Sequence, residues 1–92
     1  MRDVELRFYV PGEVILEWYG GQLGLANPPV QDLYPVFWDW LDAKGPNRKG
    51  VHVTVDMIVS PRLIARVDVT GAGSRFQDLC RFLDQVSRQI PN

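Results

Sequence analysis

The sequence has one cysteine, no long apolar run and almost no net charge. Because Cys80 is alone, it can form neither an internal disulfide nor a cysteine metal cage, and a reducing compartment fits best. No stretch is long enough to cross a bilayer, and the first residues lack the continuous apolar segment of a secretion signal. These absences predict a cytoplasmic protein without membrane contact.

The sequence also lacks an excess of positive or negative charge. Ten Lys and Arg against 11 Asp and Glu give a net charge of -1, so no global positive field exists to attract nucleic acid. A loop near residues 44–50 carries Lys44, Arg48 and Lys49, but three charges without a recognition motif disfavour nucleic acid as a partner. The near-zero charge leaves association between copies electrostatically unopposed, so a homodimer is possible.

What is present is typical of a globular domain. The 92 residues are 46% hydrophobic and 23% charged, which predicts a single domain over residues 1–92 with one core.

Alternating apolar and polar residues predict strands. Val4 to Val10 alternate strictly, and after Pro11-Gly12-Glu13 a second alternating segment runs from Val14 to Tyr19. A three-residue turn would place Val10 opposite Val14 and Arg7 opposite Glu17, so both apolar sets share one face and opposite charges meet on the other. The first part of the chain is therefore expected to form a hairpin.

A second hairpin is expected from Val51 onward. With Ser60-Pro61-Arg62 as its turn, Ile58 lies opposite Ile64 and Asp56 opposite Arg66. Each hairpin is followed by an amphipathic segment, first at about residues 32–43 and then at about 74–90. We therefore predict an α+β fold of two consecutive ββα units, about residues 3–44 and 51–90. This internal repeat would form one four-stranded antiparallel sheet with two helices on one face.

The first amphipathic segment carries more apolar surface than one sheet can cover. On a helical wheel its apolar side chains span about 200°, where about 100° suffices for a core stripe. Val36 and Trp40 lie at one edge of this arc, and Tyr34 and Trp38 lie at the other. Either a tryptophan folds over the long Gly20–Pro29 loop, or one edge is presented to a partner.

The predicted outer face of the sheet also carries apolar side chains beside both turns. Isolated surface isoleucines are common, but Tyr9, Ile15, Ile58 and Ile64 all lie beside the turns, as two pairs in equivalent places, and favour an interface. The predicted partner-binding residues on the sheet and the first helix are Tyr9, Ile15, Tyr34, Trp38, Trp40, Ile58 and Ile64.

Candidate catalytic groups are few. His52, Asp56 and Asp68 share the outer sheet face, where a histidine near carboxylates could act as a base or bind a metal. The turn Gly71–Arg75 could offer backbone amides to an anion. Neither feature comes with a pocket or a specific motif, so no cofactor or metal is expected.

The sequence therefore predicts a small non-enzymatic protein–protein interaction module, of the inhibitor, immunity or adaptor type, or a domain that binds its own copy. The alternative is a small enzyme or ligand-binding domain that uses His52, Asp56 and Asp68, or the turn Gly71–Arg75.

Overall fold

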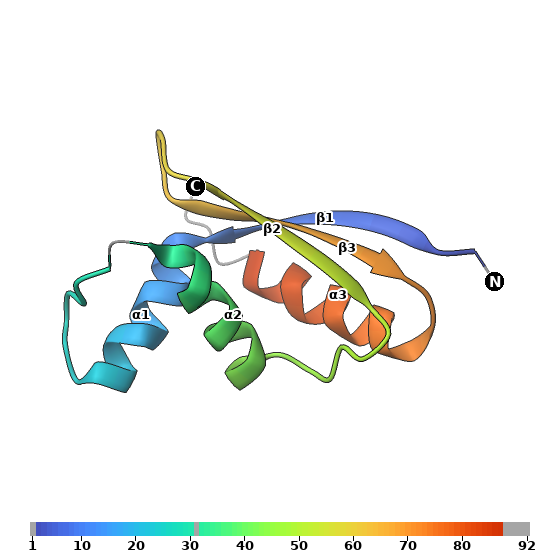
Figure 1. The fold of residues 1–92 in the computed structure, drawn as a ribbon, viewed down its shortest axis with the longest axis horizontal. Coiled ribbons are helices and arrows are strands. Elements are labelled where there is room, and N and C mark those ends of the chain that lie inside the picture. The colour runs from blue at the N-terminus through green and yellow to red at the C-terminus, as the bar shows by residue number, and fades with distance from the viewer. Residues whose placement is uncertain (1, 31, 88–92) are drawn as a thin grey trace.

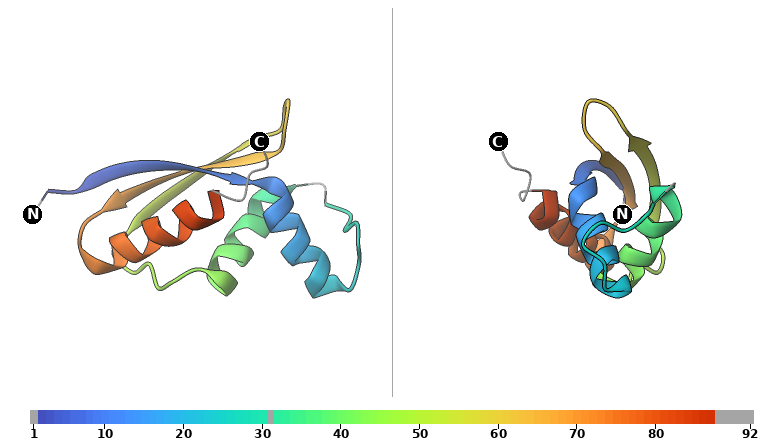
Figure 2. Two further views of the ribbon diagram at one scale, coloured as in Figure 1. Left: turned by 180° about the vertical axis from the view of Figure 1, so that it is seen from behind. Right: turned by 90° about the vertical axis from the view of Figure 1, so that its left-hand side faces the viewer.

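The structure, a computed structural model, describes residues 2–30 and 32–87 (Figure 1). Its elements follow the chain as β1 (Val4–Pro11), α1 (Gly12–Leu23), α2 (Leu33–Lys44), β2 (His52–Ile58), β3 (Ile64–Gly71) and α3 (Gly73–Ser87). The strands form an antiparallel sheet in the order β1-β3-β2. All three helices cover one face of this sheet and leave the other face open (Figures 1 and 2). None of these helices is long and apolar enough to cross a membrane.

This α+β architecture corrects the expected one. The sheet in the described residues has three strands rather than four, and three helices pack against it rather than two. The order of elements is strand–helix–helix and then strand–strand–helix, so the predicted repeat of a ββα unit is wrong. The predicted helix at residues 74–90 is present as Gly73–Ser87, and its last three residues lie outside the described part.

The error lies in the segment after Pro11, which folds as α1. Over six residues an alternating pattern and a helical pattern are hard to separate, and here Ile15 and Tyr19 already broke the strict alternation. In a helix, Glu13 and Glu17 lie on one exposed face, and Ile15 points to the opposite side, where it is fully buried. Ile15, which would face solvent in a hairpin, therefore faces the core, while Glu17 stays exposed.

The strand β1 pairs with β3 instead, and Arg7 lies 61 residues before its partner Asp68 in the sequence. The pairing places Leu6 opposite Val69 and Phe8 opposite Val67, and Arg7 meets Asp68 rather than Glu17. The β2–β3 hairpin has the predicted register, with Ile58 opposite Ile64 and Asp56 opposite Arg66. Long-range pairing thus replaces the expected first hairpin.

The helix α2 starts one residue later than expected. The side chain of Asp32 accepts a hydrogen bond of 3.0 Å from the amide of Tyr34 and caps the helix, and Pro35 falls in the first turn, where it removes no intrahelical hydrogen bond. The helix packs against α1 as well as β2. The edge of its apolar arc that carries Val36 and Trp40 is buried because two elements cover the helix, whereas Tyr34 at the other edge stays exposed.

Trp40 shows this arrangement directly. Its ring is 2% exposed and lies 5.4 Å from the ring of Phe82 in α3, measured between centroids. Val14 and Trp18 of α1 border the same shallow hollow as Trp40. Trp40 is therefore a core residue between three helices, and its predicted exposure at a partner-binding edge is wrong.

The burial of Ile15 gives a direct test of the corrected fold. Changing Ile15 to Ala should lower the free energy of unfolding by about 2–5 kcal/mol, because it removes a fully buried aliphatic side chain. Changing Leu23 to Ala in the same helix should cost about 0.5 kcal/mol or less, because that side chain is about half exposed. Urea unfolding of both variants measures the difference, and equal losses would contradict the placement of α1.

Candidate functional site

The open face of the sheet carries two ion pairs that join neighbouring strands. The guanidinium of Arg7 in β1 donates two hydrogen bonds to Asp68 in β3, from Nε at 2.7 Å and from Nη2 at 3.2 Å. The guanidinium of Arg66 donates one hydrogen bond, from Nη2 at 2.5 Å, to Asp56 in β2. Hydrogen bonding and the positive charge of Arg7 lower the pKa of Asp68, against a smaller opposing effect of desolvation. This face is therefore held in register by charge on both sides of β3.

The predicted catalytic cluster is not assembled on this face. His52 lies opposite Thr70, and Asp56 is four residues further along the same strand, on the order of 13 Å away. Both Asp56 and Asp68 are already bound by arginines. Within residues 2–30 and 32–87, no group of three His, Cys, Asp or Glu side chains could hold a metal ion.

Packing accounts for the glycines of the Gly71–Arg75 turn. A side chain at Gly71 would meet the ring of Phe76 at 3.3 Å, so the strand end and α3 approach closely there. Gly73 has a φ of 86°, which favours glycine, and it begins α3. The two glycines thus serve the tight connection between β3 and α3.

The apolar residues of the sheet gather where the β2–β3 hairpin turns. Ile58 and Ile64 face each other on the open side, Pro11 continues their row, and Tyr9 occupies the next row along β1. Val59, just beyond β2, is 73% exposed. We call Tyr9, Ile58, Val59 and Ile64 together the hairpin end. In Figure 1 the turn between β2 and β3 rises from the sheet on the side away from the helices.

A cavity of about 260 Å³ lies under this hairpin end, on the helical side of the sheet. Leu16 of α1, Leu33 of α2 and Met57 of β2 form its apolar walls, and Val59 lies at its rim together with Val30 and Leu63. Asp32 is the one charged residue among those that line it. The cavity was not predicted, because the sequence pattern had placed Leu16 in a strand.

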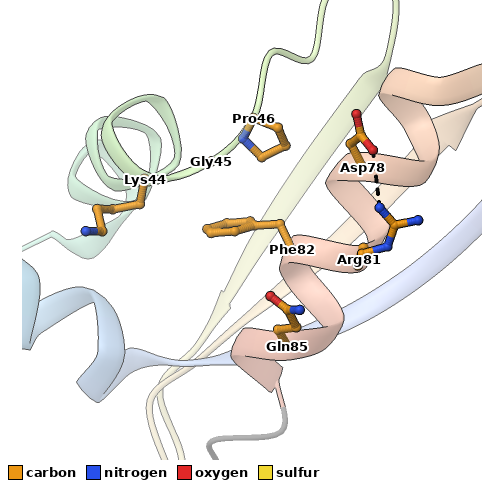
Figure 3. Close-up of a pocket in the computed structure, with 7 residues that line it drawn as sticks. All are labelled: Lys44, Gly45, Pro46, Asp78, Arg81, Phe82 and Gln85. Atoms are coloured by element: carbon orange, nitrogen blue, oxygen red, sulfur yellow. Dashed lines mark hydrogen bonds and ion pairs between the residues drawn. The ribbon is translucent and has the colours of Figure 1, made fainter.

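A larger but more open hollow of about 390 Å³ lies between the end of α2 and α3 (Figure 3). The ring of Phe82 points toward Gly45 and Pro46, while the amine of Lys44 points away from the other polar groups. The guanidinium of Arg81 lies 3.4 Å from Asp78 in the same helix. The two cations do not converge, so the hollow does not present a formed anion site.

The structure separates the predicted partner-binding residues into three groups. Tyr9, Ile58 and Ile64 lie together at the hairpin end, as expected. Ile15, predicted beside them, is in the core of the helical layer, so its expected position on the outer face is wrong. Trp40 is also buried, as described above.

Tyr34 and Trp38 form the third group, on α2. Their rings meet edge to face at 6.2 Å, and the guanidinium carbon of Arg48 lies 5.6 Å from the centre of a Trp38 ring. Arg48 also pairs with Asp42 at 2.6 Å, which occupies one of the three charges of the basic loop. Tyr34 is exposed and Trp38 is half-buried.

We compared the chain with protein-family models, with curated proteins and with solved structures, and none of them matches it.

The ion pair between Arg7 and Asp68 predicts a specific pH dependence. Because the folded-state pKa of Asp68 is lowered, its stabilising effect is complete above the ordinary pKa of aspartate and is lost as the pH falls through the folded value. Changing Arg7 to Gln should raise the pKa of Asp68 toward its ordinary value, as followed by carboxyl-carbon NMR. Changing Arg81 to Gln should leave that pKa where it is, and an equal response to both variants would contradict the pairing.

Proposed function

We propose that the protein is a non-enzymatic protein-binding module and that its hairpin end is the binding site. The observation that carries the proposal is the concentration of apolar surface on both sides of one hairpin. Tyr9, Ile58 and Ile64 lie on the open side, and the 260 Å³ cavity lies on the helical side. Apolar residues grouped around a concave site are typical of protein interfaces.

The position of β2 supports access to both sides. In the described sheet β2 is an edge strand, because it pairs only with β3. A partner can therefore approach along the free edge of β2 and contact the open face and the cavity rim at once. Val59 stands at this boundary, since it is strongly exposed and also lines the cavity.

The size of the cavity indicates what the partner inserts. An apolar cavity of about 150 Å³ can hold a benzene molecule, so a site of 260 Å³ has room for one side chain of the size of leucine or phenylalanine. Apart from Asp32 the lining is aliphatic or thioether. The expected partner is a protein segment with one large apolar anchor residue.

The chemistry of the open face supports binding over catalysis. Asp56 and Asp68 on the open face are held by arginines, and the described residues lack the enclosed group of converging titratable side chains that shifts pKa values in enzymes. The small enzyme that the sequence left as an alternative would need such a group.

Affinity capture with matched variants tests the proposal. Changing Val59 to Asp should abolish retention of the partner, because it places a charge at the cavity rim, while the fold stays intact at so exposed a position. Changing Leu23 to Asp introduces the same charge at another exposed aliphatic residue and should leave retention unchanged. The readout is the set of proteins retained from native lysate by the tagged chain and by each variant. Retention that is the same for all three chains would refute this site.

A further inference from the structure

The N-terminal half of β1 has a free edge with no neighbouring strand in the described residues. β1 pairs with β3 on one side only, and its N-terminal end extends past the start of α3 in the views of Figures 1 and 2. Burial falls steadily along it, from Val10, which is fully buried, to Leu6 and Val4, which are 43% and 48% exposed. These two side chains point to the helical side of the sheet, yet the helices cover them poorly.

A free strand edge presents unpaired backbone donors and acceptors, and proteins usually protect or pair such edges. β2 is the other edge, but Val53, Val55 and Met57 on its helical side are packed against the core. The described part of β1 is the edge that combines open backbone groups with exposed aliphatic side chains. Another strand is therefore the occupant that its chemistry fits.

The charges on β1 make it complementary to itself. On the open face β1 carries Glu5, Arg7 and Tyr9, and on the helical face it carries Val4, Leu6 and Phe8. When two copies of β1 pair antiparallel, the open faces of both sheets lie on the same side only if odd-numbered residues oppose odd-numbered ones and even-numbered residues oppose even-numbered ones. The two-fold axis of such a pair passes through one residue of β1, which then lies opposite its own copy.

Charge then selects one centre. A centre at Glu5 or at Arg7 puts that residue opposite its own copy, and a centre at Val4 puts Asp3 opposite Glu5, so all three create like-charge pairs. A centre at Phe8 leaves Val4 uncovered and brings together the two buried halves of β1, where the helical layers would collide. A centre at Leu6 places Glu5 opposite Arg7 twice.

We propose that the chain forms a symmetric dimer through antiparallel pairing of β1 with β1 of a second copy, centred on Leu6. The two sheets then join into one six-stranded sheet. On its helical face Leu6 meets its own copy and Val4 meets Phe8 of the partner subunit, which covers the exposed aliphatic side chains. In Figure 1 the helices lie toward the C-terminal end of β1 and leave its N-terminal end free, so the two helical layers would extend in opposite directions from the dimer axis.

The same arrangement extends the charge pairing of the sheet. Arg7 uses its Nε and Nη2 groups for Asp68, so further N–H donors remain for Glu5 of the partner subunit. Glu5 has no ion pair within residues 2–30 and 32–87. Each dimer would thus contain two rows in which Asp68, Arg7 and Glu5 alternate in sign. Of the residues of the hairpin end, Tyr9 alone lies in β1, and the dimer does not depend on the proposed function.

Cysteine cross-linking tests the register. In a Cys80→Ser background, a Leu6→Cys chain should form a disulfide-linked dimer with oxidised glutathione, because residues directly opposite in antiparallel strands have Cα atoms about 4.5–5.5 Å apart. The matched control Val4→Cys is equally exposed, but its two copies would lie about 13 Å apart along the strands. We expect Leu6→Cys to cross-link at least tenfold faster. Equal rates, or a faster Val4→Cys, would overturn the proposal.

Charge reversal tests the pairing without cysteines. Sedimentation of the wild-type chain up to about 1 mM, a range suited to small interfaces, should show dimers, and Glu5→Lys should raise the dissociation constant at least tenfold. The Arg7→Glu chain should also be monomeric. Mixing it with the Glu5→Lys chain should restore dimers, because both cross-strand pairs then have opposite charges. A monomeric wild type, or a mixture that stays monomeric, would refute the dimer, and circular dichroism confirms that each variant is folded.

Discussion

The structure depends on β3, the one strand of the described sheet that is paired on both edges. Three of its four core-facing residues, Ala65, Val67 and Val69, are fully buried and pack under the helices. On the open face its two charged residues form ion pairs with different neighbouring strands: Arg66 binds Asp56 of β2, and Asp68 binds Arg7 of β1. A shift of either neighbour by one residue would bury polar side chains, so β3 fixes the register of the whole sheet.

This central role explains which parts of the fold could be predicted from the sequence. The β2–β3 hairpin is local, its residues alternate strictly, and its register was predicted in full. The helix α2 was predicted to within one residue from its amphipathic periodicity. The segment after Pro11 is different, since its apolar residues fit either period, and the choice is made by burial against α2 rather than by the segment itself. Two acidic residues could pair with Arg7, Glu17 close to it in the sequence and Asp68 distant from it. The predicted local hairpin favoured Glu17, which was wrong.

The candidate site was also predictable only in its local part. The position of Tyr9, Ile58 and Ile64 on the open face of the sheet could be predicted because it depends only on strand periodicity. The cavity beneath them could not, because its walls come from α1, from the start of α2 and from the hairpin, which meet only in the folded chain. Trp40 was misplaced for a related reason: a wide apolar arc looks like a binding edge until a second helix is known to cover it. The missing element thus made a core residue resemble an interface residue.

The two proposed surfaces are compatible because the β2–β3 turn adjoins the C-terminal end of β1, while the dimer is centred nearer its N-terminal end. Pro11 adjoins Ile64 at the hairpin end, whereas Leu6 is near the other end of the strand, next to Val69. Antiparallel pairing about Leu6 therefore directs the two hairpin ends away from each other, one at each extremity of the joined sheet. Such a dimer would hold two identical binding sites on a rigid frame, so a partner that is itself dimeric or repetitive would bind with an avidity set by the spacing between them. A weak self-association and a modest single-site affinity could then combine into tight binding without any further contact.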